Sequence, residues 1–287
     1  MFHKAQPTED STDMPESTRA KISGFIEREF GIKMPPAKKT LLTSRLAKRL
    51  RAVKCADFEE YFNYINSPEG LAHEMFVFAD LVSTHETSFF RETQHFEILY
   101  NTILPELLSK GAGTGRSINI WSAGSSTGEE AYSIALTCEA FGRQNGIDDI
   151  RYTITGTDLS SKVLEVASRA IYNTSRLKTI PAGYMRYIMT SKNPDAHSIR
   201  IVPEIRSKTR FMILNLISDS YPLEKNFDII FCRNTLIYFE REIQEKICKR
   251  FLNHLNDGGY LFVGHSESLI GFSLPVKVVI PTVYRKG

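Results

Sequence analysis

The feature that most constrains the fold is an alternation of short apolar runs with helical segments through the second half of the chain. Runs rich in β-branched and aromatic residues are typical of buried strands, and they cover residues 117–122, 152–157, 210–214, 227–232 and 260–264. Amphipathic segments are typical of helices, and they cover residues 129–141, 160–170 and 241–255. This alternation predicts an α/β domain with a mostly parallel sheet and helices on both faces. The chain ends in a predicted antiparallel hairpin, residues 276–280 and 283–285.

The first third of the chain has a different period. Apolar residues recur every three or four positions and predict helices at 17–30, 37–53, 58–65 and 68–82, followed by a long helix at 92–110. The predicted organisation is therefore a flexible tail (1–16), a helical domain (17–85) and an α/β domain (86–287). Residues 172–208 interrupt the alternation with three prolines and one alternating run, which predicts an inserted antiparallel β-subdomain.

Composition and charge exclude several classes of protein. The 36 Lys and Arg nearly balance the 33 Asp and Glu, so the net charge of +3 gives no reason to expect nucleic acid. The chain lacks the run of ~20 apolar residues that spans a bilayer, and its N-terminus lacks a secretory signal. A cytoplasmic protein without membrane insertion is expected. Four scattered cysteines and histidines without ligand spacing predict no metal site.

The residues that follow the first two predicted strands suggest a ligand. The first strand leads into a small-residue turn, residues 122–128, and then Glu130. The second strand ends at Asp158, where an acid can accept both ribose hydroxyls of an adenosine ligand or cap the next helix. The chain lacks GxGxxG, and Asp158 lies farther from Gly124 than the ~20 residues of a dinucleotide site. An adenosine ligand other than a nicotinamide nucleotide is therefore favoured.

Polar residues also follow the next two strands. Asn215 and Leu216 come after the third, where an amide beside an apolar side chain suits an adenine ring or a plain turn. Arg233 and Asn234 come after the fourth, near the expected centre of the sheet. Burying such groups is costly without partners, which favours a functional role for them.

Five segments together resemble the chemotaxis receptor methyltransferase (CheR) family: FFRE, WSAGSSTGEEAYS, GTDLS, FCRNTLIYF and LFVGHSES. The resemblance covers nearly the whole chain after the tail. It implies a Rossmann-like S-adenosylmethionine-dependent methyltransferase fold. It also implies methylation of glutamates on the cytoplasmic helices of transmembrane chemoreceptors, which gives methyl esters and S-adenosylhomocysteine.

The resemblance carries roles over by position. Contacts to the cofactor are implied for Thr87, Arg91, Glu130, Asp158, Asn215, Leu216, Arg233 and Asn234. His85 occupies a position where the family usually has Asn, so its contact stays open. Arg91 is also expected to act in catalysis by holding the cofactor or the incoming glutamate. Tyr238 is expected near the transferred methyl group.

A basic helix is predicted to form a surface that binds the receptor. The basic helix at 37–54 contains no acid, and Arg45, Lys48 and Arg49 are expected to share an exposed face that binds the receptor. The insert lacks the glycine-rich turn with which some relatives grip a receptor peptide, so no tight peptide binding is expected.

Two functions are alternatives to receptor methylation: a non-catalytic cofactor-binding scaffold and a nucleic-acid methyltransferase. The latter is disfavoured because CRNTLIYF replaces the NPPY-like turn of base-modifying enzymes.

Overall fold

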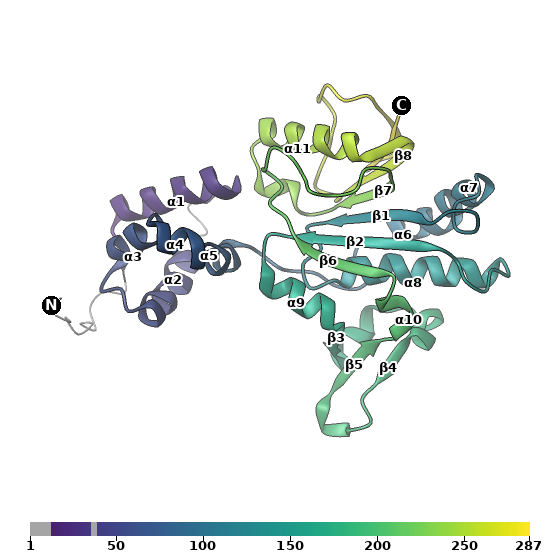
Figure 1. Cartoon of the computed structure of the whole chain (residues 1–287), viewed down its shortest axis with the longest axis horizontal. Helices are drawn as coiled ribbons and strands as arrows, with labels where there is room; N and C mark the ends of the chain where they lie inside the picture. The colour runs from purple at the N-terminus through teal and green to yellow at the C-terminus, as the bar shows by residue number, and fades with distance from the viewer. Residues whose placement is uncertain (1–12, 36–38) are drawn as a thin grey trace. The chain divides into compact units, whose positions relative to one another are not determined.

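The computed structural model describes residues 13–35 and 39–287. These residues form two compact units (Figure 1). One contains the helices up to Thr84 together with Tyr238–Glu240, and the other contains His85–Ile237 and Arg241–Gly287. Most of the predicted tail lies outside the described residues, but Met14 is buried and the first helix begins at Glu16. In the described part of the chain, no helix is both long and apolar enough to cross a bilayer.

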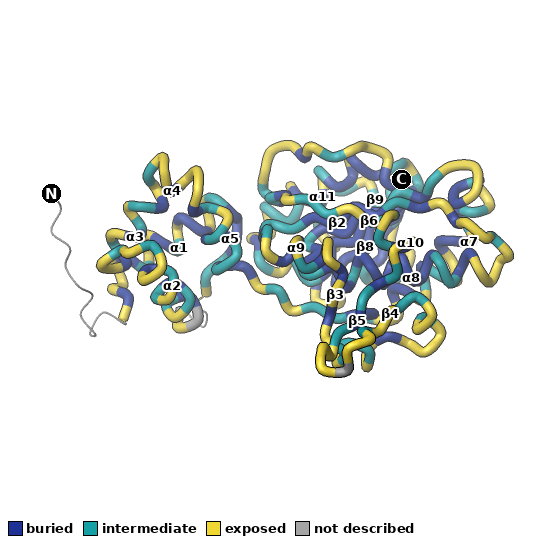
Figure 2. Tube along the Cα trace, turned by 60° about the horizontal axis from the view of Figure 1, so that its bottom comes forward, coloured by how far each residue is buried: buried dark blue, intermediate teal, exposed yellow. Residues whose placement is uncertain are grey.

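The helical unit is held together by an aromatic core. Its helices are α1 (Glu16–Phe30), α2 (Lys39–Val53), α3 (Phe58–Ile65), α4 (Pro68–His73) and α5 (Met75–Val82). Phe25 of α1 meets Phe78 of α5 edge to face at 5.7 Å between ring centroids. Side chains at helical spacing supply this core because each helix turns one apolar stripe inward, as the buried residues of Figure 2 show.

The prediction of a single helix over 68–82 is wrong, because the chain forms two helices that meet at Glu74. The Glu74 side chain is 2% exposed and accepts three hydrogen bonds. Two come from Arg49, at 2.7 and 2.6 Å, and one comes from the Tyr61 hydroxyl at 2.9 Å. A buried carboxylate needs such partners, and they lie on α2 and α3, which local periodicity cannot reveal.

The α/β unit is built on a seven-stranded sheet, and the predicted fold class is confirmed. Its strands are β1 (Ile118–Ala123), β2 (Tyr152–Asp158), β6 (Thr209–Ile213), β7 (Phe227–Cys232), β8 (Leu255–Val263), β9 (Val276–Ile280) and β10 (Val283–Lys286). The order is β6-β2-β1-β7-β8-β10-β9, with β10 antiparallel to both its neighbours and the other pairs parallel. The strand predicted at 260–264 is longer and begins at Leu255, with a register irregularity where it pairs with β7.

Helices pack against this sheet (Figure 1). They are α8 (Glu129–Gln144) and α9 (Ser161–Arg169), which contact β2, and α11 (Arg241–His254), which contacts β8. The core includes every residue of β7 and the Trp121 side chain, whose indole N–H donates to Thr157 Oγ1 at 2.9 Å. Burial on both faces explains why these strands appear in the sequence as continuous apolar runs.

The long helix predicted at 92–110 is not regular. It divides into α6 (Gln94–Ile98), a π-helical turn η2 (Leu99–Ile103) and α7 (Leu104–Ser109). The amide of Leu104 bonds to the carbonyl of Leu99. Pro105 follows directly and has no N–H to donate, so the wider turn lies where an α-helical bond would be missing.

The insert forms its own three-stranded antiparallel sheet in the order β3-β5-β4 (Figure 1). The strands are β3 (Ile171–Asn173), β4 (Ile188–Thr190) and β5 (Ser198–Ile201). The turn between β4 and β5 contains no glycine, and His197 takes the left-handed backbone conformation there, with φ of 39°.

Candidate functional site

The carboxyl ends of β1, β2 and β7 meet at one edge of the sheet. Register pairs Ser122 of β1 with Gly156 on one side and with Phe231 on the other, so the loops after these strands lie together. In the loop after β1, Gly124 has φ of 77°. A Cβ atom at Gly124 would lie 2.3 Å from Thr235 Oγ1, which belongs to the loop after β7. Only glycine allows the two loops to approach this closely.

Asp158 is the last residue of β2, and its carboxylate supports the loop after β1. One oxygen accepts the Ser126 amide at 2.9 Å and the other accepts the Ser160 amide at 3.0 Å. Burial raises the pKa of Asp158, while these backbone hydrogen bonds and His85 act in the opposite direction. A carboxylate offers about four lone-pair sites, so both oxygens can still accept hydroxyl donors from a ligand.

Arg233 is the centre of a buried charge network at the end of β7. Its side chain is 2% exposed. The guanidinium donates to Glu92 at 3.0 and 3.3 Å, to Glu130 at 3.3 Å and to the carbonyl of Arg91. The Glu130 carboxylate also accepts the Ser122 hydroxyl at 2.7 Å. Burial raises the pKa of Glu130, and Arg233 opposes that shift. Arg233 and Glu130, both expected to contact the cofactor, are therefore in direct contact with each other.

Two further carboxylates belong to this network, and the sequence reasoning missed both. Glu92 accepts the Asn234 side-chain amide at 3.1 Å in addition to Arg233. Glu267, in the loop after β8, accepts the backbone amides of Asn234 at 2.9 Å and of Gly264 at 2.5 Å. Burial raises the pKa of Glu267 and these bonds lower it. The sequence did contain a signal for these two carboxylates, because each lies in a segment that resembles the CheR family.

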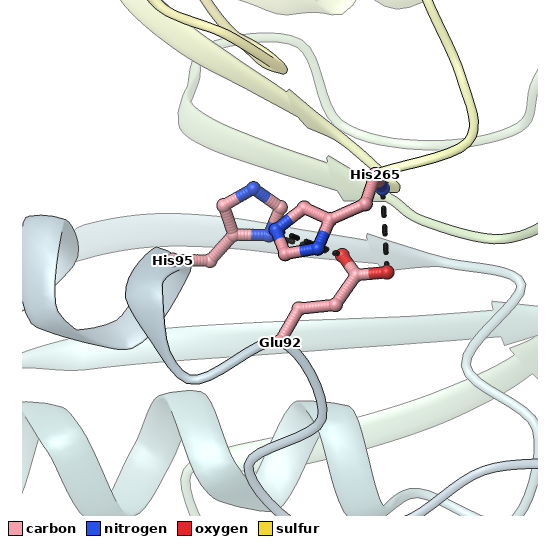
Figure 3. A group of neighbouring side chains, drawn as sticks. All are labelled: Glu92, His95 and His265. Atoms are coloured by element: carbon pink, nitrogen blue, oxygen red, sulfur yellow. Dashed lines mark hydrogen bonds and ion pairs between the residues drawn. The ribbon is translucent and has the colours of Figure 1, made fainter.

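Figure 3 shows the Glu92 carboxylate beside two neighbouring histidines, His95 and His265, which lie far apart in the sequence. Nδ1 of His95 lies 3.4 Å from Glu92 Oε2, and Nε2 of His265 lies 4.0 Å from the same oxygen. Burial and Arg233 lower the pKa of His95 to about 4, so its ring is neutral at pH 7. Its Nε2 is 2.7 Å from Thr282 Oγ1.

The three side chains could be taken for metal ligands, because their ligand atoms lie within 4.8 Å of one another. The surroundings do not suit a cation. Both oxygens of Glu92 already accept N–H donors, and the guanidinium of Arg233 lies 3.0 Å from Oε2. A positive charge at that distance repels a second cation. We therefore assign no metal to this cluster.

The other predicted cofactor residues lie in the same unit. Asn215 and Leu216 come just after β6, and the Leu214 amide donates to the carbonyl of Asp158 at 2.9 Å, which brings them beside the end of β2. The carbonyl of His85 accepts the Ser126 hydroxyl at 3.3 Å. The carbonyl of Thr87 accepts Arg176 at 2.8 Å.

Arg91 and Tyr238 are the two residues that the family resemblance implies for catalysis. Arg91 is exposed and its guanidinium donates to the carbonyl of Glu86 at 3.0 Å. Tyr238 groups with the helical unit, where its carbonyl accepts the Lys33 amide at 2.9 Å. The role of Tyr238 near the methyl group stays a prediction.

Comparison with known proteins identifies the family. Residues 85–284 match the family model "CheR methyltransferase, SAM binding domain" and residues 19–79 match "CheR methyltransferase, all-alpha domain". A chemotaxis protein methyltransferase of Borreliella burgdorferi is 32% identical over 93% of this chain and 93% of its own length. That of Salmonella typhimurium is 36% identical over 92% of this chain and 88% of its own. Chemotaxis protein methyltransferase 1 of Pseudomonas aeruginosa is 37% identical over 85% and 88%.

The chain belongs to the CheR methyltransferase family. The resemblance noted from the five sequence segments is thereby confirmed, and the α/β unit is the S-adenosylmethionine-binding domain of a CheR methyltransferase.

The residues at the strand ends of this family member fit such a cofactor. The Ser125 hydroxyl is buried and has no hydrogen-bond partner. It lies in the same loop as Ser126, which bonds to Asp158. An orphaned buried hydroxyl, a carboxylate with free lone pairs and a buried guanidinium together match a ligand with ribose hydroxyls, an ammonium and a carboxylate.

The basic helix of this family member differs from the predicted geometry. Leu42, Leu46 and Leu50 are buried as the periodicity indicated. Arg45 and Arg49, however, do not share a free face with Lys48. Arg45 donates to the carbonyls of Leu81 and Ser83 at 2.7 and 2.9 Å, and Arg49 is committed to Glu74. The prediction of an exposed arginine pair is wrong because buried acceptors on neighbouring segments require these donors. Lys38 lies outside the described residues, and Lys48 is exposed.

Proposed function

We propose that the chain transfers a methyl group from S-adenosylmethionine to glutamate side chains of chemoreceptors in the cytoplasm, which yields glutamate methyl esters. The observation that carries the proposal is the match to chemotaxis protein methyltransferases over most of both chains. S-adenosylmethionine, when bound, supplies the methyl group as an electrophile and is released as S-adenosylhomocysteine.

The chain's residues are proposed to position the reactants. Asp158 accepts ribose hydroxyls, and Arg233 and Asn234 orient the amino-acid end of the cofactor. Arg91, whose carbonyl accepts from Arg233 and whose side chain is exposed, holds the cofactor carboxylate or receives the incoming glutamate. A glutamate with pKa ~4.3 is ionised at neutral pH and needs no general base. Proximity and orientation then supply the rate.

The proposal is tested by methyl transfer to membranes that contain chemoreceptors. The chain with radiolabelled S-adenosylmethionine is expected to label a receptor-sized band, and mild base is expected to release the label as methanol. Asp158→Ala protein is the control and is expected to label far less. Label that survives base, or label on nucleic acid instead of receptor, would contradict glutamate ester formation.

The receptor contact proposed for α2 rests on Lys48, since its two neighbouring arginines are engaged in the fold. Lys48→Glu is expected to slow receptor methylation about 3-fold at low salt and little at high salt, because the ~8–10 Å screening length shortens. Arg49→Glu is expected instead to lower the melting temperature of the helical unit, because it leaves Glu74 buried without its cation. Initial rates across a salt series and thermal melts distinguish the two effects. An unchanged rate for Lys48→Glu at low salt would exclude this contact.

A further inference from the structure

Glu92 occupies an unusual backbone position. Its φ of 57° is in the left-handed region, which non-glycine residues rarely adopt, and Phe90 two residues before has φ of 52°. The loop is held in this conformation because Phe89 and Phe90 are buried and the Phe90 amide donates to Ser133 Oγ at 2.9 Å. A strained backbone held by packing is often part of a functional arrangement. Figure 3 shows the Glu92 side chain extending toward the end of β8.

The Glu92 carboxylate joins the ends of two strands. It accepts Nε and Nη2 of Arg233 at 3.3 and 3.0 Å and the Asn234 side-chain amide at 3.1 Å, both after β7. It also accepts the backbone amide of His265, after β8, at 3.3 Å. Burial raises the pKa of Glu92, but Arg233, Asn234 and His265 outweigh burial and the pKa lies below its usual value. The carboxylate is therefore charged at neutral pH and bonded on both oxygens.

An ionised carboxylate only accepts hydrogen bonds, and this fixes the groups around it. The Asn234 side chain must turn its NH₂ group to Glu92, which leaves its carbonyl oxygen to accept from a ligand. Arg233 must present Nε and Nη2 to Glu92 and Nη1 to Glu130. A glutamine at position 92 keeps only one acceptor oxygen, so its NH₂ group would face either the Arg233 donors or the amides of Asn234 and His265 and would release one of these constraints.

We propose that Glu92 is a positioning residue for the cofactor site: it orients Arg233 and Asn234 without touching the cofactor itself. This inference rests on the proposed function, in which Arg233 and Asn234 contact the cofactor. It adds a role for the last residue of the FFRE segment, which neither the spacing of residues nor the family descriptions assign.

The opposite end of β7 offers a matched control. Asp228 is 2% exposed and accepts the same kinds of donor: Arg116 at 2.7 Å twice, an asparagine side-chain amide at 3.0 Å and a backbone amide at 2.9 Å. It lies at the start of the strand, whereas Arg233 follows the strand's last residue. Asp228→Asn therefore removes an equivalent charge from an equivalent network away from the site.

The experiment measures S-adenosylhomocysteine affinity by calorimetry, and melting temperature, for the full chain and its variants. Glu92→Gln is expected to weaken binding at least 10-fold, while Asp228→Asn changes it less than 2-fold despite a comparable loss of melting temperature. Glu92→Asp keeps the charge but has a shorter reach, so it is expected to weaken binding about 3-fold and to remain folded if Glu92→Gln does not.

The outcomes separate the inference from the function on which it rests. Unchanged affinity in folded Glu92→Gln, or in Glu92→Asp if the former does not fold, overturns the positioning role. Equal weakening by Asp228→Asn also overturns it, because the effect would then be general destabilisation. Arg233→Lys is measured in parallel. If Arg233→Lys also binds as the wild type does, the assignment of Arg233 to the cofactor fails; if it binds weakly while the Glu92 variants bind normally, only the role of Glu92 fails.

Discussion

Replacing Arg233 with methionine is expected to lower the free energy of unfolding by about 3–5 kcal/mol and to abolish S-adenosylhomocysteine binding. The guanidinium is buried between Glu92 and Glu130, and removing one partner of a buried ion pair leaves the other charge without compensation. Glu130 accepts one further bond from Ser122, which cannot replace a positive charge. Denaturant unfolding and calorimetry measure the two effects.

Arg116→Met is the control for that experiment. Arg116 also forms a bidentate pair with an acid, Asp228, but its side chain is 48% exposed and lies at the other end of the strands. Solvent therefore compensates part of its loss. This variant is expected to be less destabilised and to bind the cofactor product normally. Binding retained by a folded Arg233→Met protein would show that the buried network is structural only.

Asp158→Ala is expected to weaken S-adenosylhomocysteine binding about 100-fold or more. The variant loses up to two charge-assisted hydrogen bonds to ribose hydroxyls, each worth ~1.5–3 kcal/mol, and every 1.4 kcal/mol is about ten-fold in affinity. It also frees the amides of Ser126 and Ser160, which loosens the loop after β1. Calorimetric titration of the folded variant measures the loss.

Asp57→Ala is a suitable comparison for that experiment, because Asp57 also accepts a backbone amide at the start of a helix. Its Oδ1 accepts the Glu60 amide at 2.8 Å in the helical unit. Asp57→Ala is expected to lower the free energy of unfolding by ~1 kcal/mol and to leave the affinity for S-adenosylhomocysteine unchanged. If Asp158→Ala resembles Asp57→Ala in both measurements, Asp158 is a helix-capping residue and the ribose assignment is wrong.

Much of the sheet could be predicted from the sequence because its strands are buried on both faces. The run at 227–232 coincides with β7. The run at 117–122 is shifted by one residue from β1, and the run at 152–157 lacks only the last residue of β2. Local composition suffices for such elements, since an apolar run bounded by turn residues has few alternatives to a central strand. The helices predicted between successive strands then indicated that these strands run parallel to one another.

The same reasoning located part of the candidate site. Asp158, Arg233 and Asn234 could be singled out because they directly follow strands, and strand ends of parallel sheets form ligand sites. Position after a strand does not single out Glu92, Glu267 or the two histidines, and the two acids could have been found only through the family segments to which they belong. The exposure expected for Arg45 and Arg49 was wrong for a related reason, since their acceptors are supplied by other helices.

The sequence by itself determined the strands of the large sheet, most of the helices and the family, because these depend on periodicity and on motifs within short segments. Only the tertiary structure decided which charges neutralise one another. Arg233 and Glu92 are 141 residues apart in the chain and meet only when the sheet brings the end of β7 beside the loop before α6. Hydrogen bonds and ion pairs act over a few ångströms, so their partners are chosen by the folded arrangement of distant segments.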